Sequence, residues 1–298
     1  MNKLLFTGAS GFLGRNIMPI LAEKYDITTI GIMPSDTITT DLTKEIPELH
    51  DRYDVVLHAA GKAHINPKTE DEKKSFYELN LVGTINLCKA LEASFLPKSL
   101  IFISTLSVYG DNPGQMDTEE SRSLIGDSPY SDSKIKAEEY LSSWCKEHNV
   151  VLGILRPSIL AGKNAPGNLG AMVNGIRSGA YLSIAGGQAR KSMLMADDIA
   201  YLVPLVAEKG GTYNVCDDNH PSFRELEVLI AKQLGKRPPI SIPYWMAKCL
   251  AMVGDLFSFF PINSKKLEKI TTSDVWSNEK AKRELGWQPM DVLENYKI

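Results

Sequence analysis

The chain has 298 residues, of which 43% are hydrophobic and 23% charged, and its net charge is −3. This composition is typical of a globular protein with one large α/β domain and a smaller second lobe, and the charge argues against nucleic acid as a partner. No signal peptide precedes the first apolar run, so we expect a cytoplasmic protein. The four cysteines form no C-x-x-C pair and the five histidines show no ligand spacing. We therefore expect reduced core thiols and no metal site.

The first apolar run, Lys3–Phe6, leads directly into the segment TGASGFLG. Gly8, Gly11 and Gly14 stand three apart, and the apolar residues that follow have helical spacing. Glycines between a strand and a helix N-terminus let backbone N–H groups approach a pyrophosphate closely. The first gap is one residue longer than in the G-x-G-x-x-G fingerprint. At this position we favour a dinucleotide site over a plain strand–helix turn.

Strand-like runs recur further along the chain, separated by helical patterns. The runs cover 27–32, 55–58, 100–104 and 150–155, and the clearest helical patterns cover 70–93 and 131–148. This alternation predicts an α/β fold, a Rossmann-type doubly wound parallel sheet. The pattern changes to short mixed elements near residue 160. We therefore expect an NAD(P)-binding domain over 1–160, whose last elements are free to interleave with a smaller mixed C-terminal substrate-binding lobe over 161–298.

Two short elements are predicted within that lobe. The segment GGTYNVCDD predicts a short strand. The segment after it predicts a helix that is capped at Ser222 and ends before Gly235.

Tyr130 and Lys134 lie four residues apart near the start of a predicted helix, so they share one face. A neighbouring ammonium favours the phenolate and lowers the pKa of a phenol, which allows proton exchange with an alcohol or ketone. Such pairs are usually part of a solvated helix face. Here an earlier strand ends in the hydroxyls of Ser104 and Thr105, and a hydroxyl at that edge can hold the substrate oxygen.

Together these segments resemble the extended short-chain dehydrogenase/reductases, which include nucleotide-sugar epimerases, dehydratases and reductases. The resemblance rests on the glycine loop, Asp41-Leu42, His58-Ala59-Ala60-Gly61, Ser104-Thr105 with Val108-Tyr109-Gly110, and Tyr130-x-x-x-Lys134, and it extends to the terminal KRELGWQP. It implies NAD or NADP as cofactor and a nucleotide-sugar substrate. It further implies hydride transfer at C4 of the sugar for surface polysaccharide synthesis, with a homodimer as one possible assembly.

The resemblance also assigns roles to single residues. Thr105, Tyr130 and Lys134 would be catalytic, with Tyr130 as the acid/base. The cofactor would contact Gly8, Gly11, Phe12, Leu13, Gly14, Asp41, Leu42, Ala59, Ala60, Gly61, Ser104, Tyr130, Lys134 and Pro157. The substrate would contact Asn168, Arg190 and Lys191. The alternatives are a helix N-cap for Asn168 and solvated loop charges for the basic pair, and His64 is interpreted as a surface histidine.

Three departures from the family pattern narrow the function. Leu106 and Ser107 replace the acidic pair of the dehydratases, which disfavours dehydration. Gly31 stands where members that prefer NAD usually carry an acid, so the choice between NAD and NADP stays open. The segment 157–160 replaces an asparagine typical of epimerases, and with Gly31 it inclines the prediction towards a 4-keto reductase over an epimerase.

Two other functions compete with this one. A non-catalytic NAD(P)-binding sensor or scaffold would have no need of Thr105, Tyr130 and Lys134. A reductase of a non-nucleotide ketone would have no need of the basic pair at 190–191.

The apolar stretch 242–262 is too short to span a membrane, and Lys248 and Asp255 interrupt it. We expect a helix packed on the lobe or on another subunit, in preference to attachment at a membrane surface.

Overall fold

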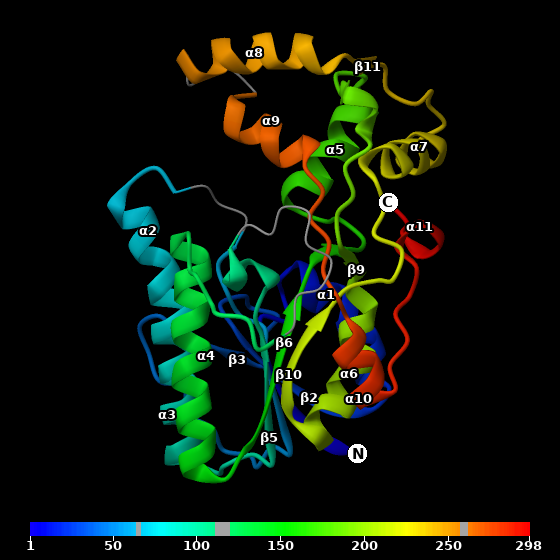
Figure 1. The fold of residues 1–298 in the computed structure, drawn as a ribbon. Helices are drawn as coiled ribbons and strands as arrows, with labels where there is room; N and C mark the ends of the chain where they lie inside the picture. Colours follow the sequence, from blue (N-terminus) through cyan, green and yellow to red (C-terminus); the bar gives the residue numbers. More distant parts are fainter. Residues whose placement is uncertain (64–66, 111–119, 257–261) are drawn as a thin grey trace.

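The computed structural model describes residues 1–63, 67–110, 120–256 and 262–298 (Figure 1). Its main sheet has seven strands in the order β10-β6-β5-β4-β1-β2-β3, and the strands run parallel. They are β1 (Asn2–Thr7), β2 (Tyr25–Gly31), β3 (Ile38–Thr39), β4 (Val55–His58), β5 (Ser99–Ile103), β6 (Val151–Pro157) and β10 (Gly211–Val215). The predicted doubly wound Rossmann-type fold is confirmed.

Helices cover both faces of this sheet (Figure 1). One face carries α1 (Phe12–Ala22), α6 (Ala196–Lys209) and α10 (Glu279–Leu285), and the other carries α3 (Gly83–Ala93) and α4 (Pro129–His148). Leu4 and Phe6 of β1 belong to the first core, whereas Leu5 between them belongs to the second. Because both faces are buried, the central strands are mostly apolar, and this pattern made them recognisable in the sequence.

The helical pattern predicted over 70–93 is divided into three pieces. They are α2 (Glu70–Tyr77), a π-helical turn at Glu78–Val82 and α3. Thr69 starts α2 through a capping box with Glu72. The π-helical turn contains the buried Asn80, and such turns are frequent at functional sites.

The C-terminal part adds two helices and two small parallel sheets. The helices are α5 (Gly167–Ser178) and α7 (Phe223–Gln233), and the sheets pair β7 (Ile159–Ala161) with β9 (Met193–Met195) and β8 (Ser183–Ile184) with β11 (Ser241–Ile242). The capping box of Ser222 with Glu225 starts α7, as predicted. Because α6 and β10 return to the main sheet, the chain passes between the two parts more than once, and the division at residue 160 stays a prediction.

The C-terminal part is tied to the sheet by aromatic and helical contacts. Trp276 stacks on the buried Tyr109 with ring centroids 5.1 Å apart, and α10 contacts β10. A last short helix, α11 (Val292–Asn295), follows α10. Two further helices, α8 (Tyr244–Leu256) and α9 (Ser264–Thr271), lie at the end of the molecule remote from the sheet (Figure 1).

The helices of the described chain include none that is long and apolar enough to cross a bilayer. Cys88, Cys145 and Cys216 are buried, as expected for core thiols. The same expectation is wrong for Cys249, which is exposed on α8, because this helix turns its small residues inward.

Candidate functional site

The glycine loop joins the carboxyl end of β1 to α1, and its three glycines have different tasks. Gly8 has a φ of +82°, and a Cβ there would lie 2.6 Å from the Ala60 nitrogen. A Cβ on Gly14 would lie 2.3 Å from the Ala9 oxygen. Gly11 is exposed and is the N-cap of α1, where no side chain caps the helix. The first-turn N–H groups therefore stay available, and the loop fits a pyrophosphate.

A buried histidine fixes the turn that packs on this loop. The ring of His58 hydrogen-bonds the hydroxyls of Thr7 (2.6 Å) and Thr84 (2.8 Å). The Thr84 hydroxyl donates to the Asn80 carbonyl, so it accepts from Nε2 of His58, and Nδ1 accepts from Thr7. Burial, with a smaller effect of the Lys134 charge, lowers the pKa of His58 to about 3. The neutral ring thus holds the start of the Ala59-Ala60-Gly61 turn, where the Ala60 N–H donates to Thr7.

Lys134 lies between the carboxyl ends of β4 and β5. Its Nζ donates to the Ile103 carbonyl (2.8 Å) and lies 4.4 Å from the centre of the Phe102 ring. A Cβ on Gly61 would come within 3.1 Å of Nζ, so glycine allows this approach. Burial lowers the pKa of Lys134 to about 8, and the charge of Glu138 opposes that shift.

Tyr130 lies in the first turn of α4, which Ser128 caps and Pro129 begins. Its ring packs near Phe76, with centroids 6.2 Å apart. Burial raises the pKa of Tyr130 above its ordinary value of 10.0, and a hydrogen bond with Thr105 opposes the rise. Lys134 is not among the groups that shift this pKa, so the predicted lowering of the Tyr130 pKa by Lys134 is not observed in the ligand-free protein. The predicted juxtaposition of Tyr130 with Thr105 is present.

A buried polar network that was not predicted from the sequence lies directly behind these residues. Arg156 of β6 binds the Glu138 carboxylate through two nitrogens, at 2.5 and 3.1 Å, and donates to the Tyr109 hydroxyl at 2.5 Å. The Ser104 hydroxyl also donates to Glu138. Ser104, expected at the cofactor, thus uses its side chain in the network. One signal was visible, because Glu138 follows Lys134 by one helical turn and Arg156 is a charge within an apolar strand.

Asn80 was also missed, because nothing in the sequence marks the π-helical turn. Its side chain accepts from the Lys62 N–H (2.7 Å) and donates to the Ser133 hydroxyl (2.9 Å). It therefore connects the turn after β4 to α4, one residue before Lys134.

Four of the other predicted cofactor residues lie at or near the same sheet edge. Phe12 and Leu13 are half-buried in the first turn of α1, and Pro157 ends β6. Leu42 is buried, and its carbonyl accepts from the Asn86 amide. Their contacts with the cofactor stay predictions.

Asp41 is held in a local turn near the third strand. Its carboxylate accepts from the hydroxyl and the N–H of Thr43 and pairs with Lys44 at 3.0 Å. The Thr43 hydroxyl contributes most to the lowered pKa of Asp41. The carboxylate is thus ionised, and its contact with adenine stays a prediction.

The predicted substrate residues are spread over the C-terminal part. Asn168 is exposed in the first turn of α5, whose N-cap is Pro166, so the N-cap explanation for Asn168 is wrong. Arg190 pairs with Glu225 at 3.2 Å, and Lys191 lies 3.9 Å from the Asp274 carboxylate. Each cation thus faces an acid, and contact of these residues with the substrate stays a prediction. His64 lies outside the described residues.

The carboxylate of Asp36 lies where the side chain of an acidic residue at position 31 would lie. A Cβ on Gly31, the last residue of β2, would lie 2.3 Å from the Asp36 carboxylate. That carboxylate is buried and accepts from the Met33 N–H at 3.0 Å. The loop after β2 folds back on itself, so a residue five positions later takes the place of a side chain at 31.

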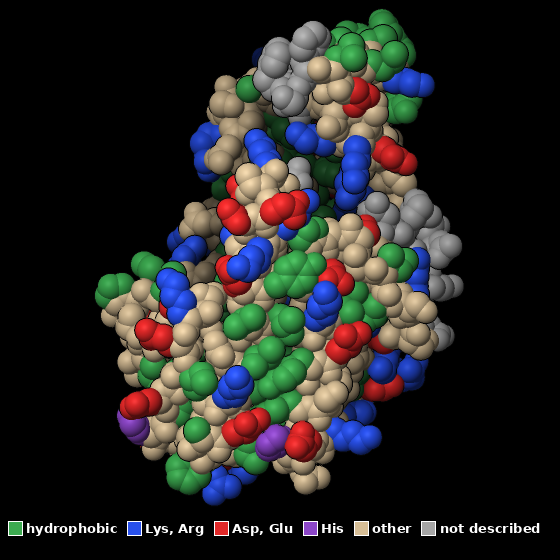
Figure 2. Space-filling view, turned by 90° about the vertical axis from the view of Figure 1, so that its left-hand side faces the viewer, with side chains coloured by type: hydrophobic (Ala, Val, Ile, Leu, Met, Phe, Trp, Pro, Cys, Tyr) green, Lys and Arg blue, Asp and Glu red, His purple; other side chains and the backbone are tan. Residues whose placement is uncertain are grey.

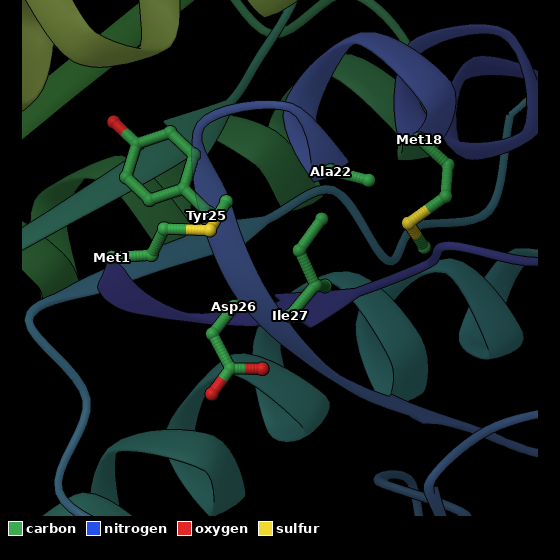
Figure 3. A pocket seen from close by; sticks show the side chains of 6 residues that line it. All are labelled: Met1, Met18, Ala22, Tyr25, Asp26 and Ile27. Atoms are coloured by element: carbon green, nitrogen blue, oxygen red, sulfur yellow. The ribbon is translucent and has the colours of Figure 1, made fainter.

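A surface depression of about 630 Å³ lies at the amino ends of the strands, opposite the candidate site (Figure 3). It is lined by residues from the end of α1 and the starts of β1 and β2, namely Met1, Met18, Ala22, Tyr25, Asp26 and Ile27. Ligands of open α/β sheets bind at the carboxyl ends of the strands, so this depression is separate from the candidate site.

The fold and the site together define a dinucleotide-binding α/β protein. Its hydroxyl and ammonium groups lie at the carboxyl ends of the strands, next to the glycine loop. The chain belongs to the NAD-dependent epimerase/dehydratase family, whose sequence profile matches residues 4–216. This membership confirms the predicted family and the cofactor class, NAD or NADP.

Two relatives and one solved structure illustrate the range of the family. The UDP-glucose 4-epimerase of Vibrio cholerae is 26% identical, over 98% of this chain and 92% of the relative. The GDP-6-deoxy-D-mannose reductase of Pseudomonas aeruginosa is 27% identical, over 77% and 79%. The fold is similar to that of the UDP-glucose 4-epimerase of Thermotoga maritima, solved with UDP-glucose, with a TM-score of 0.76, 20% identity and coverage of 98% and 95%.

The glycine loop gives the first prediction. Gly11→Val should weaken NAD binding at least about tenfold in calorimetry, because the new side chain covers the exposed N-terminus of α1. Its melting temperature without ligand should stay near that of the wild type. Gly14→Val is the matched contrast, since its Cβ would lie 2.3 Å from the Ala9 oxygen, whereas a Cβ on Gly11 would lie 3.2 Å from the Gly8 oxygen, and it should lose stability by about 1–3 kcal/mol or more. Unchanged NAD affinity in Gly11→Val would place the phosphates elsewhere.

Lys134 gives the second prediction. Between its folded pKa of about 8 and its ordinary 10.5, the unfolded chain binds more protons, so this residue makes stability rise with pH across that window. Below it, the buried ammonium costs up to about 3 kcal/mol. Lys134→Met should therefore be at least as stable as the wild type at pH 7, lack that pH dependence and be inactive. The measurement is denaturant unfolding of the ligand-free proteins, and a clearly less stable variant would contradict it.

Proposed function

We propose that the protein is an NAD-dependent 4-epimerase of a nucleotide-linked sugar. The observation that carries this proposal is the grouping of Thr105, Tyr130 and Lys134 at the sheet edge that bears the glycine loop. A protein that only senses or binds a dinucleotide has no use for this grouping. The sequence resemblance supports a role in surface polysaccharide synthesis.

The residues present divide the reaction between them. NAD supplies the group that takes hydride from the sugar and returns it. Tyr130 takes the proton of the C4 hydroxyl and later gives one back to the C4 oxygen, after the keto sugar has turned its other face. The Thr105 hydroxyl bonds the same oxygen, and the Lys134 ammonium favours the phenolate that must accept the proton. Burial raises the pKa of Tyr130 and so favours the phenol. Formation of the phenolate is therefore assigned to the site with cofactor and substrate bound.

Asp36 supports NAD over NADP. A carboxylate at the end of the second strand accepts hydrogen bonds from ribose hydroxyls and repels a 2′-phosphate. The place of Asp36 beside Gly31 removes one of the two reasons for preferring a reductase. An epimerase that retains one NAD through every cycle fits this arrangement.

A 4-keto reductase is the second candidate. The segment 157–160 favours it, because that segment replaces an asparagine typical of epimerases. The same three residues would act in either enzyme, so the two are separated by cofactor turnover.

Asp36 gives the third prediction. Asp36→Asn keeps an oxygen that can accept from Met33 but removes the charge. The ratio of NADP to NAD affinity should rise at least about tenfold in calorimetric titrations, because a charge–charge repulsion is lost. Asp26→Asn changes an exposed acid at the start of β2, remote from Gly31, and should leave the ratio unchanged. An unchanged ratio in Asp36→Asn as well would exclude Asp36 from the cofactor site.

The proposed activity gives the fourth prediction. Purified protein should interconvert UDP-glucose and UDP-galactose, or their N-acetyl forms, with no net change in nicotinamide absorbance. Tyr130→Phe should bind NAD normally and lose about 10²–10⁴ in rate. Stoichiometric consumption of NADH or NADPH with a UDP-linked 4-keto sugar, and no interconversion, would establish the reductase instead.

A further inference from the structure

Helix α8 packs on its own lobe with its smallest residues. Ala247, Ala251 and Gly254 recur four and three residues apart and are buried, and α8 lies against α9. A Cβ on Gly254 would lie 1.8 Å from the Ile262 carbonyl oxygen. The buried face of this helix is thus made for close backbone approach and contains none of its large apolar side chains.

The large apolar side chains face away from the lobe. Trp245, Cys249, Met252 and Leu256 follow the spacing i, i+4, i+7, i+11 and form one stripe, which we call the outer stripe. Trp245 is 67%, Met252 59% and Leu256 79% exposed. A helix of a globular protein normally turns such a stripe to the core, and exposed contiguous apolar surface marks an interaction site. Figure 2 shows hydrophobic side chains gathered at this end of the molecule.

The surroundings of the outer stripe are basic. Residues 236–271 contain six Lys and Arg against two Asp and Glu, although the whole chain has a net charge of −3. Lys248 on α8 and Lys265 on α9 are exposed. An apolar helix face with an aromatic residue at one end and lysines nearby is the pattern of helices that lie in the surface of an anionic bilayer.

We infer that α8 is a docking surface for an anionic phospholipid bilayer, with the outer stripe in the headgroup region. The helix has 13 residues and is about 20 Å long, so it lies along the surface and does not cross it. A second copy is a weaker occupant, because symmetric pairing through α8 brings two basic lobes together. For this segment the sequence favoured packing on the lobe or on another subunit over attachment at a membrane surface. Packing on the lobe accounts for the small residues and leaves the outer stripe uncovered in the described chain.

This inference does not rest on the proposed function. The outer stripe belongs to the end of the molecule opposite the sheet (Figure 1), so variants of it should turn over a water-soluble nucleotide sugar at the wild-type rate. Failure of either proposal can therefore be recognised separately.

The experiment is flotation of the full chain with vesicles. We expect binding to phosphatidylcholine vesicles containing about a third phosphatidylglycerol and at least about tenfold weaker binding to phosphatidylcholine alone. Trp245→Ser with Met252→Ser should weaken binding at least about tenfold, and Lys248→Glu with Lys265→Glu should remove the preference for the anionic lipid. Phe95→Ser, at an exposed apolar residue elsewhere, is the matched control and should bind as the wild type does.

Cys249 offers a second measurement, because the other three cysteines are buried. A membrane-impermeant maleimide should label Cys249 readily in solution and several-fold more slowly once anionic vesicles are added. Absence of flotation with anionic vesicles would overturn the inference. A second outcome would also overturn it. If the wild-type protein does not bind lipid and is a dimer by light scattering, and the variant with Trp245→Ser and Met252→Ser is a monomer, then α8 is an interface between copies.

Discussion

The ion pair between Glu138 and Arg156 is the interaction on which the site depends. Both side chains are buried, and an unpaired charge there would cost several kcal/mol. The pair is bidentate, and the hydroxyls of Ser104 and Tyr109 bond its two ends. It thereby joins α4 to β6 and to the segment that follows β5. Lys134 is one helical turn from Glu138 and Thr105 follows Ser104, so the pair fixes the two elements from which the reactive groups project.

The parts of this protein that the sequence predicts are those in which the signal is local. A strand buried on both faces is a continuous apolar run, and Val55–His58 was predicted with its observed bounds. The glycine loop can be recognised in the sequence because its glycines are required by the local backbone conformation and by close backbone contacts. The capping box of Ser222 with Glu225 is likewise contained in four residues. In each case the residues that form the structural feature also form the sequence pattern that predicts it.

The parts that the sequence does not predict depend on which remote groups become neighbours. Asp36 reaches Gly31 because a loop folds back, and nothing in the pattern of the loop specifies that return. The π-helical turn that positions Asn80 has no signature of its own. The orientation of α8 was missed for a related reason. Its apolar residues cover most of the helix, and the side that faces the protein is recognised only in the structure, from the burial of Ala247 and Ala251 and the close approach at Gly254.

The two buried cations of the site differ in a way that bears on its chemistry. Arg156 has a carboxylate partner at hydrogen-bond distance, whereas Lys134 has a carbonyl and an aromatic ring, and feels Glu138 only through its charge. The positive charge of Lys134 is therefore only partly neutralised, in a place where burial strengthens electrostatic effects. Such a charge favours any negative charge that develops at the same sheet edge, whether on the Tyr130 oxygen or on a substrate oxygen. The network of Glu138 and Arg156 holds the Lys134 ammonium in place. The burial of this ammonium lowers the stability of the fold, and the same buried charge is what the proposed chemistry requires.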